Sequence, residues 1–251
     1  MKKKRLIGVV TIKDDLAVQS FGYKNYLPLG KPEIIVKNLD IWGADEILVN
    51  VIDRSNRLMG PNYKILKKIS SMKISTPLIY GGGIQKLEQA IKVISYGADR
   101  ILLDSLIKFN FNEIKKISNN LGSQALILSM PSIYKEKKLY RYDYIDKKNL
   151  IFNNKIIKLI SKNFISELLI TDVENEGTLN KFNFNILDQI KIKNANLILF
   201  GGLCDVNKIL KVLKKRNINA VCIGNGLNYK ENNINFFKSN KLSKLLRTFN
   251  E

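Results

Sequence analysis

Histidine is absent from this sequence of 251 residues, and cysteine is scarce. Without histidine, the Ser-His and Cys-His nucleophile systems and the usual general base are excluded. Any proton transfer must therefore use a carboxylate, Lys, Tyr, Cys or water. The two cysteines, Cys204 and Cys222, lack a CxxC spacing, so no metal site is expected and they fit a reducing compartment.

Long apolar runs are also missing, because no stretch approaches the ~20 residues that a membrane-spanning helix needs. Residues 1–5 are basic, like the start of a signal peptide. However, Lys13, Asp14 and Asp15 interrupt the apolar stretch that follows, and no small-residue cleavage site appears. We therefore expect a cytoplasmic protein that makes no membrane contact.

Acidic residues are few: 22 Asp and Glu stand against 42 Lys and Arg, a net charge of +20. One interpretation is a nucleic-acid-binding protein, which a salt-dependent shift of random duplex DNA would reveal. The other is compositional, since lysines are scattered from Lys2 to Lys244 and aromatic residues do not interleave with them. A basic surface also favours anionic substrates or an acidic partner.

Two glycine turns resemble each other. Each follows an apolar run of strand length and precedes apolar residues at helical spacing; the turns are Gly81-Gly82-Gly83 and Gly201-Gly202. Glycine permits positive φ and lets main-chain N–H groups approach a ligand closely. A helix N-terminus just beyond suits a phosphate, so both turns are candidate phosphate sites.

Short apolar runs alternate with helical patterns along the whole chain. The expected strands are 6–11, 46–51, 77–80, 100–103, 125–130, 167–172, 196–200 and 220–223. The expected helices lie near 32–42, 62–72, 86–95, 112–120, 152–162, 183–190, 205–215 and 234–247. Eight such pairs predict an α/β fold, a (β/α)8 TIM barrel that forms a single domain over 1–251.

The two halves of the chain repeat each other. Asp45-Glu46-Ile47-Leu48-Val49 matches Ser166-Glu167-Leu168-Leu169-Ile170, and the glycine turns recur at nearly the same offset. This repeat predicts two duplicated (β/α)4 halves, about 1–121 and 122–251. The two phosphate sites would then lie on opposite sides of one barrel mouth, which fits a ligand with a phosphate at each end.

Two stretches between the expected elements are too long for simple connections. The first, 12–31, follows the first strand; the second, 131–150, follows the fifth and contains Tyr134, Tyr140, Tyr142 and Tyr144. Long loops at this end of a barrel are candidate lids. The tyrosines could equally form a small hairpin that packs on itself.

Collinear motifs over nearly the whole chain resemble one family. They are Arg5-Leu6-Ile7 with Lys13-Asp14, Gly43-Ala44-Asp45-Glu46, Gly81-Gly82-Gly83-Ile84, Gly97-Ala98-Asp99-Arg100, Gly122-Ser123-Gln124, Glu167-Leu168-Leu169-Ile170-Thr171, Glu176-Gly177-Thr178 and Phe200-Gly201-Gly202. The family is the cyclase subunit of imidazole glycerol phosphate synthase, a histidine-biosynthesis barrel with a glutaminase partner. The resemblance implies no cofactor.

The resemblance implies the positions of both phosphate sites. The first would use Gly82, Gly83, Asp104 and Ser105, and the second Gly177, Gly202, Gly224 and Asn225. Asp104 departs from the family, which has an amide there. Because a carboxylate repels a phosphate unless it is bridged or protonated, the second site is expected to be the better preserved.

The resemblance also implies an ammonia gate, a ring of four charged residues at the barrel bottom. The matching positions are Arg5, Glu46, Arg100 and Glu167, all with the appropriate charge. A glutaminase would then dock on the N-terminal face of the barrel. The alternative is an ordinary ion-pair cluster that plugs the barrel end.

The catalytic pair departs from the family, whose members use two aspartates at the ends of strands one and five. The aligned residues are Thr11 and Met130, neither of which suits general acid–base catalysis. Candidate replacements are Lys13, Asp172, Glu174 and Glu176, although Lys13 also fits a solvated lid and Glu176 a loop cap. Ordinary imidazole ring closure is therefore expected to be impaired.

A branch of this family with such losses is associated with surface-polysaccharide biosynthesis. There the barrel and its glutaminase supply ammonia to a sugar amidotransferase that makes an acetamidino sugar. The stretches Pro61-Asn62-Tyr63-Lys64 and Gly30-Lys31-Pro32 resemble that branch. The first hypothesis is thus an ammonia-conducting barrel with a phosphorylated or nucleotide-linked sugar as ligand. The second is a working cyclase with reassigned acid–base residues, and the third is a nucleic-acid-binding barrel.

Overall fold

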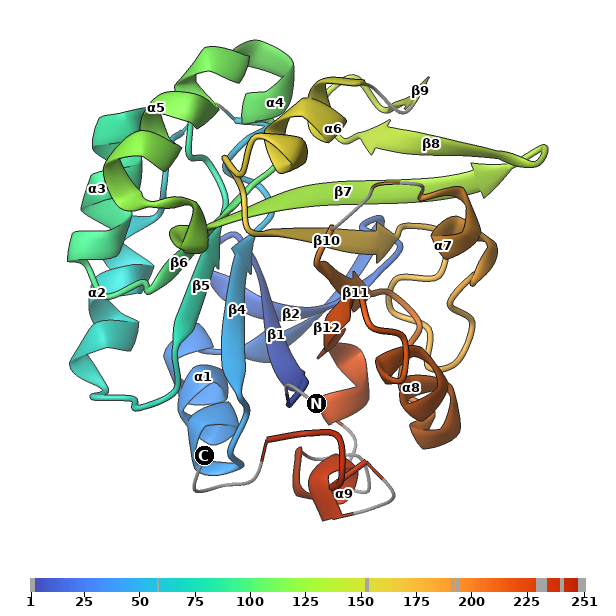
Figure 1. The fold of residues 1–251 in the computed structure, drawn as a ribbon. Helices are drawn as coiled ribbons and strands as arrows, with labels where there is room; N and C mark the ends of the chain where they lie inside the picture. The colour runs from blue at the N-terminus through green and yellow to red at the C-terminus, as the bar shows by residue number, and fades with distance from the viewer. Residues whose placement is uncertain are drawn as a thin grey trace.

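Parallel strands close into a barrel in the computed structural model of this chain (Figure 1). The structure describes residues 3–57, 59–151, 154–190, 192, 195–228, 234–239 and 242–247. Within these ranges the barrel has eight strands: β1 Arg5–Lys13, β4 Glu46–Val51, β5 Leu78–Gly81, β6 Arg100–Leu103, β7 Leu126–Lys135, β10 Glu167–Asp172, β11 Leu197–Phe200 and β12 Ile218–Ile223. Each pairs in parallel with the next, and β12 pairs with β1 to close the ring. The predicted (β/α)8 barrel is confirmed.

Side chains alternate along each strand between two apolar layers. Ile7, Leu48 and Ile127 belong to a cluster inside the barrel, whereas Leu6, Ile47 and Leu128 pack in the layer between strands and helices. Because strands buried on both faces need apolar residues at every position, they appear in the sequence as short continuous apolar runs. The same alternation decides which polar residues of a strand face the barrel axis.

Helices follow the strands and cover the outside of the barrel (Figure 1). They are α1 Pro32–Ile41, α2 Tyr63–Ser71, α3 Leu87–Ser95, α4 Leu106–Phe109, α5 Phe111–Leu121, α6 Asn154–Ser161, α7 Asn185–Gln189, α8 Val206–Leu213 and α9 Ile234–Ser239. Local chemistry sets several starts: Pro32 begins α1, and the side chains of Asn62, Asn110 and Asp205 cap α2, α5 and α8. None of the helices in the described ranges is long and apolar enough to cross a membrane.

The two long stretches extend the sheet rather than forming irregular loops. Residues 12–31 make an antiparallel hairpin of β2 Leu16–Phe21 and β3 Asn25–Gly30, which pairs with the end of β1. In the second stretch β7 continues past the barrel rim and pairs with β8 Lys138–Asp143, which pairs with β9 Lys148–Ile151. The β7–β8 hairpin projects beyond the barrel in Figure 1. Both stretches therefore add walls above the mouth of the barrel.

The end of the chain covers the opposite, N-terminal end of the barrel. Helix α9 is short, and residues 242–247 form a turn that leads to a parallel bridge between Leu246 and Lys4. Lys238 of α9 forms a buried ion pair of 2.7 Å with Asp45, next to β4. Of the helix predicted near 234–247, the structure shows Ile234–Ser239 as helix and 242–245 as a turn, while 240 and 241 lie outside the described residues. The pairing of Leu246 with Lys4 takes the place of further helix.

Candidate functional site

A cavity of about 850 Å³ opens at the carboxyl ends of the strands. Its walls include Asn50, Gly81, Leu102 and Thr171 at the ends of barrel strands, and residues from both hairpins. This is the end of the barrel where active sites of this fold lie. The cavity is large enough for a sugar phosphate or a nucleotide-sized ligand.

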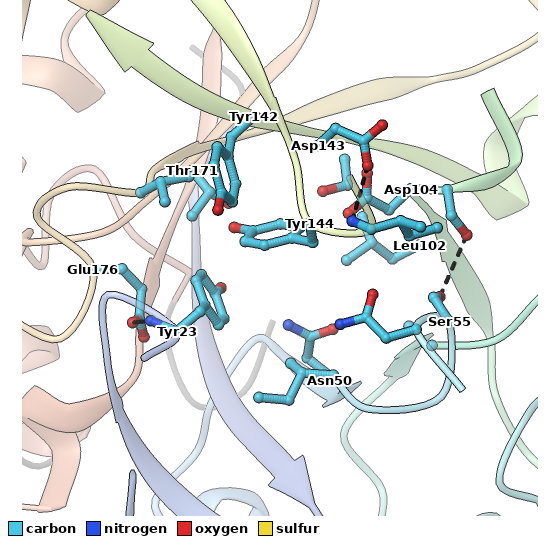
Figure 2. A pocket seen from close by; sticks show the side chains of 18 of the residues that line it. Tyr23, Asn50, Ser55, Leu102, Asp104, Tyr142, Asp143, Tyr144, Thr171 and Glu176 are labelled. Carbon is cyan, nitrogen blue, oxygen red and sulfur yellow. Dashed lines mark hydrogen bonds between the residues drawn. The ribbon is translucent and has the colours of Figure 1, made fainter. Parts of the chain in front are cut away.

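Three tyrosines from the two long stretches meet in the cavity. Tyr23 and Tyr144 pack edge to face at 5.1 Å between ring centroids, and Tyr142 packs on Tyr144 in the same way. Figure 2 shows Tyr144 in the middle of the cavity, with Glu176 on one side and Asp104 and Ser55 on the other. Removal from water raises the pKa of Tyr23 and Tyr144 well above the ordinary value, so both stay protonated. Tyr134 and Tyr140 do not line the cavity.

The first glycine turn forms part of the cavity wall. Gly83 has a φ of +74°, and a Cβ there would lie 2.3 Å from the carbonyl oxygen of Gly60, so only glycine fits. Its N–H donates to Ser55 Oγ at 3.3 Å, and Ser55 Oγ lies 3.3 Å from Ser105 Oγ. The turn, both serines and Asp104 border the same space. The structure thus brings together Gly82, Gly83, Asp104 and Ser105.

Asp104 is bridged by an arginine that comes from the β7–β8 hairpin. Arg141 Nη2 donates to Asp104 Oδ1 and, at 3.2 Å, to the backbone oxygen of Asp104. Burial raises the pKa of Asp104, although Arg141 acts in the opposite direction. The carboxylate therefore lies beside a cation, which satisfies the condition under which it need not repel a phosphate.

The second glycine turn has little free space. Gly177, Gly202, Gly224 and Asn225 border a space of about 20 Å³, which is room for about one water molecule. The Asn225 amide donates to Ser20 O at 2.7 Å and accepts from Ser20 N at 3.3 Å, so it holds β2. In this arrangement a phosphate does not fit. The resemblance favours the second turn as the better-preserved site, whereas the geometry favours the first.

The β2–β3 hairpin is also held by Glu176. Its carboxylate accepts from Ser20 Oγ at 2.9 Å and from Tyr23 N at 3.1 Å. Burial raises the pKa of Glu176. Tyr23 has a φ of +54°, unusual for a bulky residue, and the bond from its N–H to Glu176 helps to hold that conformation. Glu176 thus anchors the hairpin, as a loop cap would.

Four charged side chains form a closed ring of ion pairs at the opposite end of the barrel. Arg5 contacts Glu46 at 2.9 Å and also Glu167, while Arg100 contacts Glu46 at 3.4 Å and Glu167 at 2.7 Å. Burial opposes ionisation of Glu167, but Arg5 and Arg100 outweigh it and lower the pKa of that carboxyl. All four residues share the inward face at the start of their strands. The predicted juxtaposition is therefore present in the structure.

Comparison with known proteins matches residues 5–233 to the model of a family described as "Histidine biosynthesis protein". That match covers most of the chain. The chain belongs to this family.

Relatives of this family member carry similar names. A protein of Vibrio vulnificus (strain YJ016), "Putative imidazole glycerol phosphate synthase subunit hisF2", is 30% identical over 81% of this chain and 75% of its own length. A "Putative imidazole glycerol phosphate synthase subunit HisF" of Leptospira borgpetersenii is 25% identical over 92% of each chain. The "Imidazole glycerol phosphate synthase subunit HisF" of Staphylococcus aureus (strain MRSA252) is 24% identical over 95% of this chain and 96% of its own.

Thr11 and Met130, the positions that the resemblance aligns with two aspartates, lie on different faces of their strands. Thr11 faces the barrel axis at the end of β1 and is buried. Met130 needs a correction: it packs in the layer between strands and helices, so it does not face the barrel mouth. The inward face at that point of β7 belongs to Ser129 and Pro131, because side chains alternate. The inward-facing residues of β7 are therefore displaced by one position from Met130, and neither Ser129 nor Pro131 is a carboxylate.

The candidate replacement residues have different surroundings. Asp172 is fully enclosed and accepts hydrogen bonds from Asn175 and Asn183, which shapes the loop after β10. Lys13 pairs with Asp14 at 2.8 Å on the surface and does not line the cavity. Glu174 is exposed on the cavity wall, and its carboxylate accepts no hydrogen bond from the described residues. Of the four, Glu174 thus presents an exposed carboxylate to the cavity.

Two cavity residues are not identified by the sequence patterns. Tyr23 lies in the expected lid, but nothing local indicates that its ring packs on Tyr144 and on the apolar interior of the barrel. Arg141 stands between Tyr140 and Tyr142 in the second long stretch. The sequence pattern does not predict which side chains of this stretch face the cavity. Alternation of side chains along β8 could identify Arg141, but only once these residues are known to form a strand.

Proposed function

We propose that this family member is the ammonia-conducting barrel of a glutamine amidotransferase complex. The observation that carries the proposal is the closed ring of Arg5, Glu46, Arg100 and Glu167 at one end of an apolar barrel interior. The cavity at the other end receives what passes through. The ring pairs each charge with two opposite ones, so it is an entrance without net charge.

The interior above the ring suits a neutral molecule. Ile7, Leu48, Ile79 and Ala220 line the axis, with the Cys222 thiol among them. Burial raises the pKa of Cys222 well above its usual value, so the thiol is uncharged. Moving an ammonium ion into such surroundings costs many kcal/mol, whereas ammonia has no charge to desolvate. We therefore expect transfer as ammonia.

The partner that supplies ammonia would be a glutaminase on the N-terminal face, where the ring lies. The names of the relatives describe each of them as a subunit, which agrees with a complex. The acceptor would be a phosphorylated or nucleotide-linked sugar, amidated by a sugar amidotransferase. The stretches around Lys31 and Asn62, which support this branch, lie at the starts of α1 and α2.

Loss of ordinary imidazole ring closure follows from the positions that lack carboxylates. A steady-state assay with the histidine-pathway nucleotide and an ammonium salt tests it, with the Staphylococcus aureus relative as positive control. We expect no turnover above background. Turnover in the ordinary enzymatic range of about 1–10³ s⁻¹ would support a working cyclase instead, and Glu174→Gln would then identify the base.

A further inference from the structure

Arg141 has more hydrogen-bonding capacity than Asp104 uses. Its side chain is 8% exposed, and both of its hydrogen bonds, to Asp104 Oδ1 and O, come from Nη2. Nε is buried without a partner, and Nη1 donates no hydrogen bond to any described residue. A buried charged donor without an acceptor is costly, so a group placed in this way indicates an absent acceptor.

The surroundings of Arg141 indicate that the acceptor is an anion. A chain of contacts along the cavity wall joins Arg141 to Asp104, then the neighbouring Ser105 to Ser55, and Ser55 to the N–H of Gly83. Hydroxyl and main-chain donors around a planar guanidinium match the oxygens of a phosphate. The tyrosine rings on the far side offer a face to a sugar.

We propose that Arg141 binds the anionic group of the cavity ligand, a sugar phosphate monoester, and that Asp104 positions Arg141 for this contact. The carboxylate that departs from the family pattern is thus part of the binding site. The second glycine turn borders a space of only about 20 Å³, so the proposal concerns the anion site at the first glycine turn. This proposal rests on the proposed function in one respect: the cavity is where the ligand binds.

A simpler role for Arg141 would be to neutralise Asp104 without contacting the ligand. A double-mutant cycle of the two residues distinguishes this role from phosphate binding. The probe is glucose 1-phosphate, with glucose as the uncharged comparison, and binding is followed by NMR chemical shifts of the ¹⁵N-labelled protein. The proteins are wild type, D104N, R141Q and D104N/R141Q, with thermal unfolding to show that each is folded. Lys138→Gln, which removes an exposed charge from the same strand, is the matched control.

If Arg141 contacts the phosphate, D104N/R141Q binds glucose 1-phosphate at least about tenfold more weakly than D104N, and K138Q binds like wild type. Glucose alone shows no difference between these variants. The proposal is overturned if D104N/R141Q binds as tightly as D104N, since Arg141 would then only balance Asp104. It is also overturned if wild type binds the phosphate no better than glucose. Neither result affects ammonia transfer, which is measured with variants of the charged ring.

Discussion

Several charged residues of this barrel are held in place by ion pairs with charged neighbours. Glu46 and Glu167 are the clearest case, because each lies between Arg5 and Arg100. Removing one member of a buried ion pair leaves its partners uncompensated, which costs about 3–5 kcal/mol. The ring is therefore sensitive to neutral substitution at a single position.

At this scale we predict that Glu46→Gln uncouples the barrel from its glutaminase. With one acid replaced, Arg5 and Arg100 lose part of their compensation and the ring rearranges. In the complex, the rate of product formation with glutamine as the ammonia source should fall about tenfold or more. The rate with an added ammonium salt should stay near that of wild type.

The control is Glu113→Gln, a buried carboxylate of α5 that accepts from Leu87 N and lies outside the ring. Coupling should survive this change. If E46Q is folded and still couples fully, the four charges are a structural plug and not a gate.

At the scale of elements, the β2–β3 hairpin decides how much of the mouth is open. Glu176 and Asn225 both hold Ser20, which fixes the hairpin against Gly177. From the internal repeat we infer that the halves at about 1–121 and 122–251 are duplicates. Their glycine turns now differ, because one borders the large cavity and the other borders a space of about 20 Å³.

Gly177→Ala should detach this hairpin. A Cβ at Gly177 would lie 2.2 Å from Ser20 O and 2.8 Å from Phe21 Cα, and the residue has a φ of +84°. We expect a loss of about 1–3 kcal/mol in the free energy of unfolding. Faster amide hydrogen exchange at residues 16–30 should accompany it.

Gly122→Ala is a matched control, since Gly122 has a φ of +81° but nothing within 4 Å of the added Cβ. Alanine there also has a positive φ, but the added Cβ meets no clash. Equal exchange rates at residues 16–30 in the two variants would show that contact with Gly177 does not hold the hairpin.

For the whole molecule, the net charge of +20 makes stability sensitive to acid. Protonating carboxylates adds positive charge to a chain that already repels itself. Several carboxylates also have a pKa below the ordinary value in the folded state, among them Asp40 and Glu167. The folded state favours their ionised forms, so their contribution is present above about pH 4 and is lost as the pH falls.

Asp40→Asn should remove one such contribution. Burial alone would raise the pKa of Asp40, but Lys37 and the hydrogen bonds from Thr76 and Ser75 lower it well below 3.8. In urea unfolding at about pH 7 the variant should lose roughly 1–3 kcal/mol, and its stability should fall less steeply than that of wild type below pH 4. Asp188→Asn, at an exposed position of α7, removes the same charge and should change neither quantity. A D40N curve parallel to wild type below pH 4 would contradict the assignment.

The sequence by itself determined the barrel and its glycine turns, because these depend on local periodicity, and its resemblance to a known family indicated the four residues of the charged ring. Side chains alternate with a period of two along each strand, so Arg5, Glu46, Arg100 and Glu167 at the strand starts must share one face.

Only the tertiary structure decided which residues line the cavity. Arg141 reaches Asp104 from 37 positions away, and Tyr23 meets Tyr144 across two hairpins. For Met130 too, the sequence does not determine which way the side chain faces, since a shift of one residue reverses the direction of a side chain. Such contacts depend on how the two long stretches pair beyond the barrel rim, and no local sequence pattern encodes that geometry.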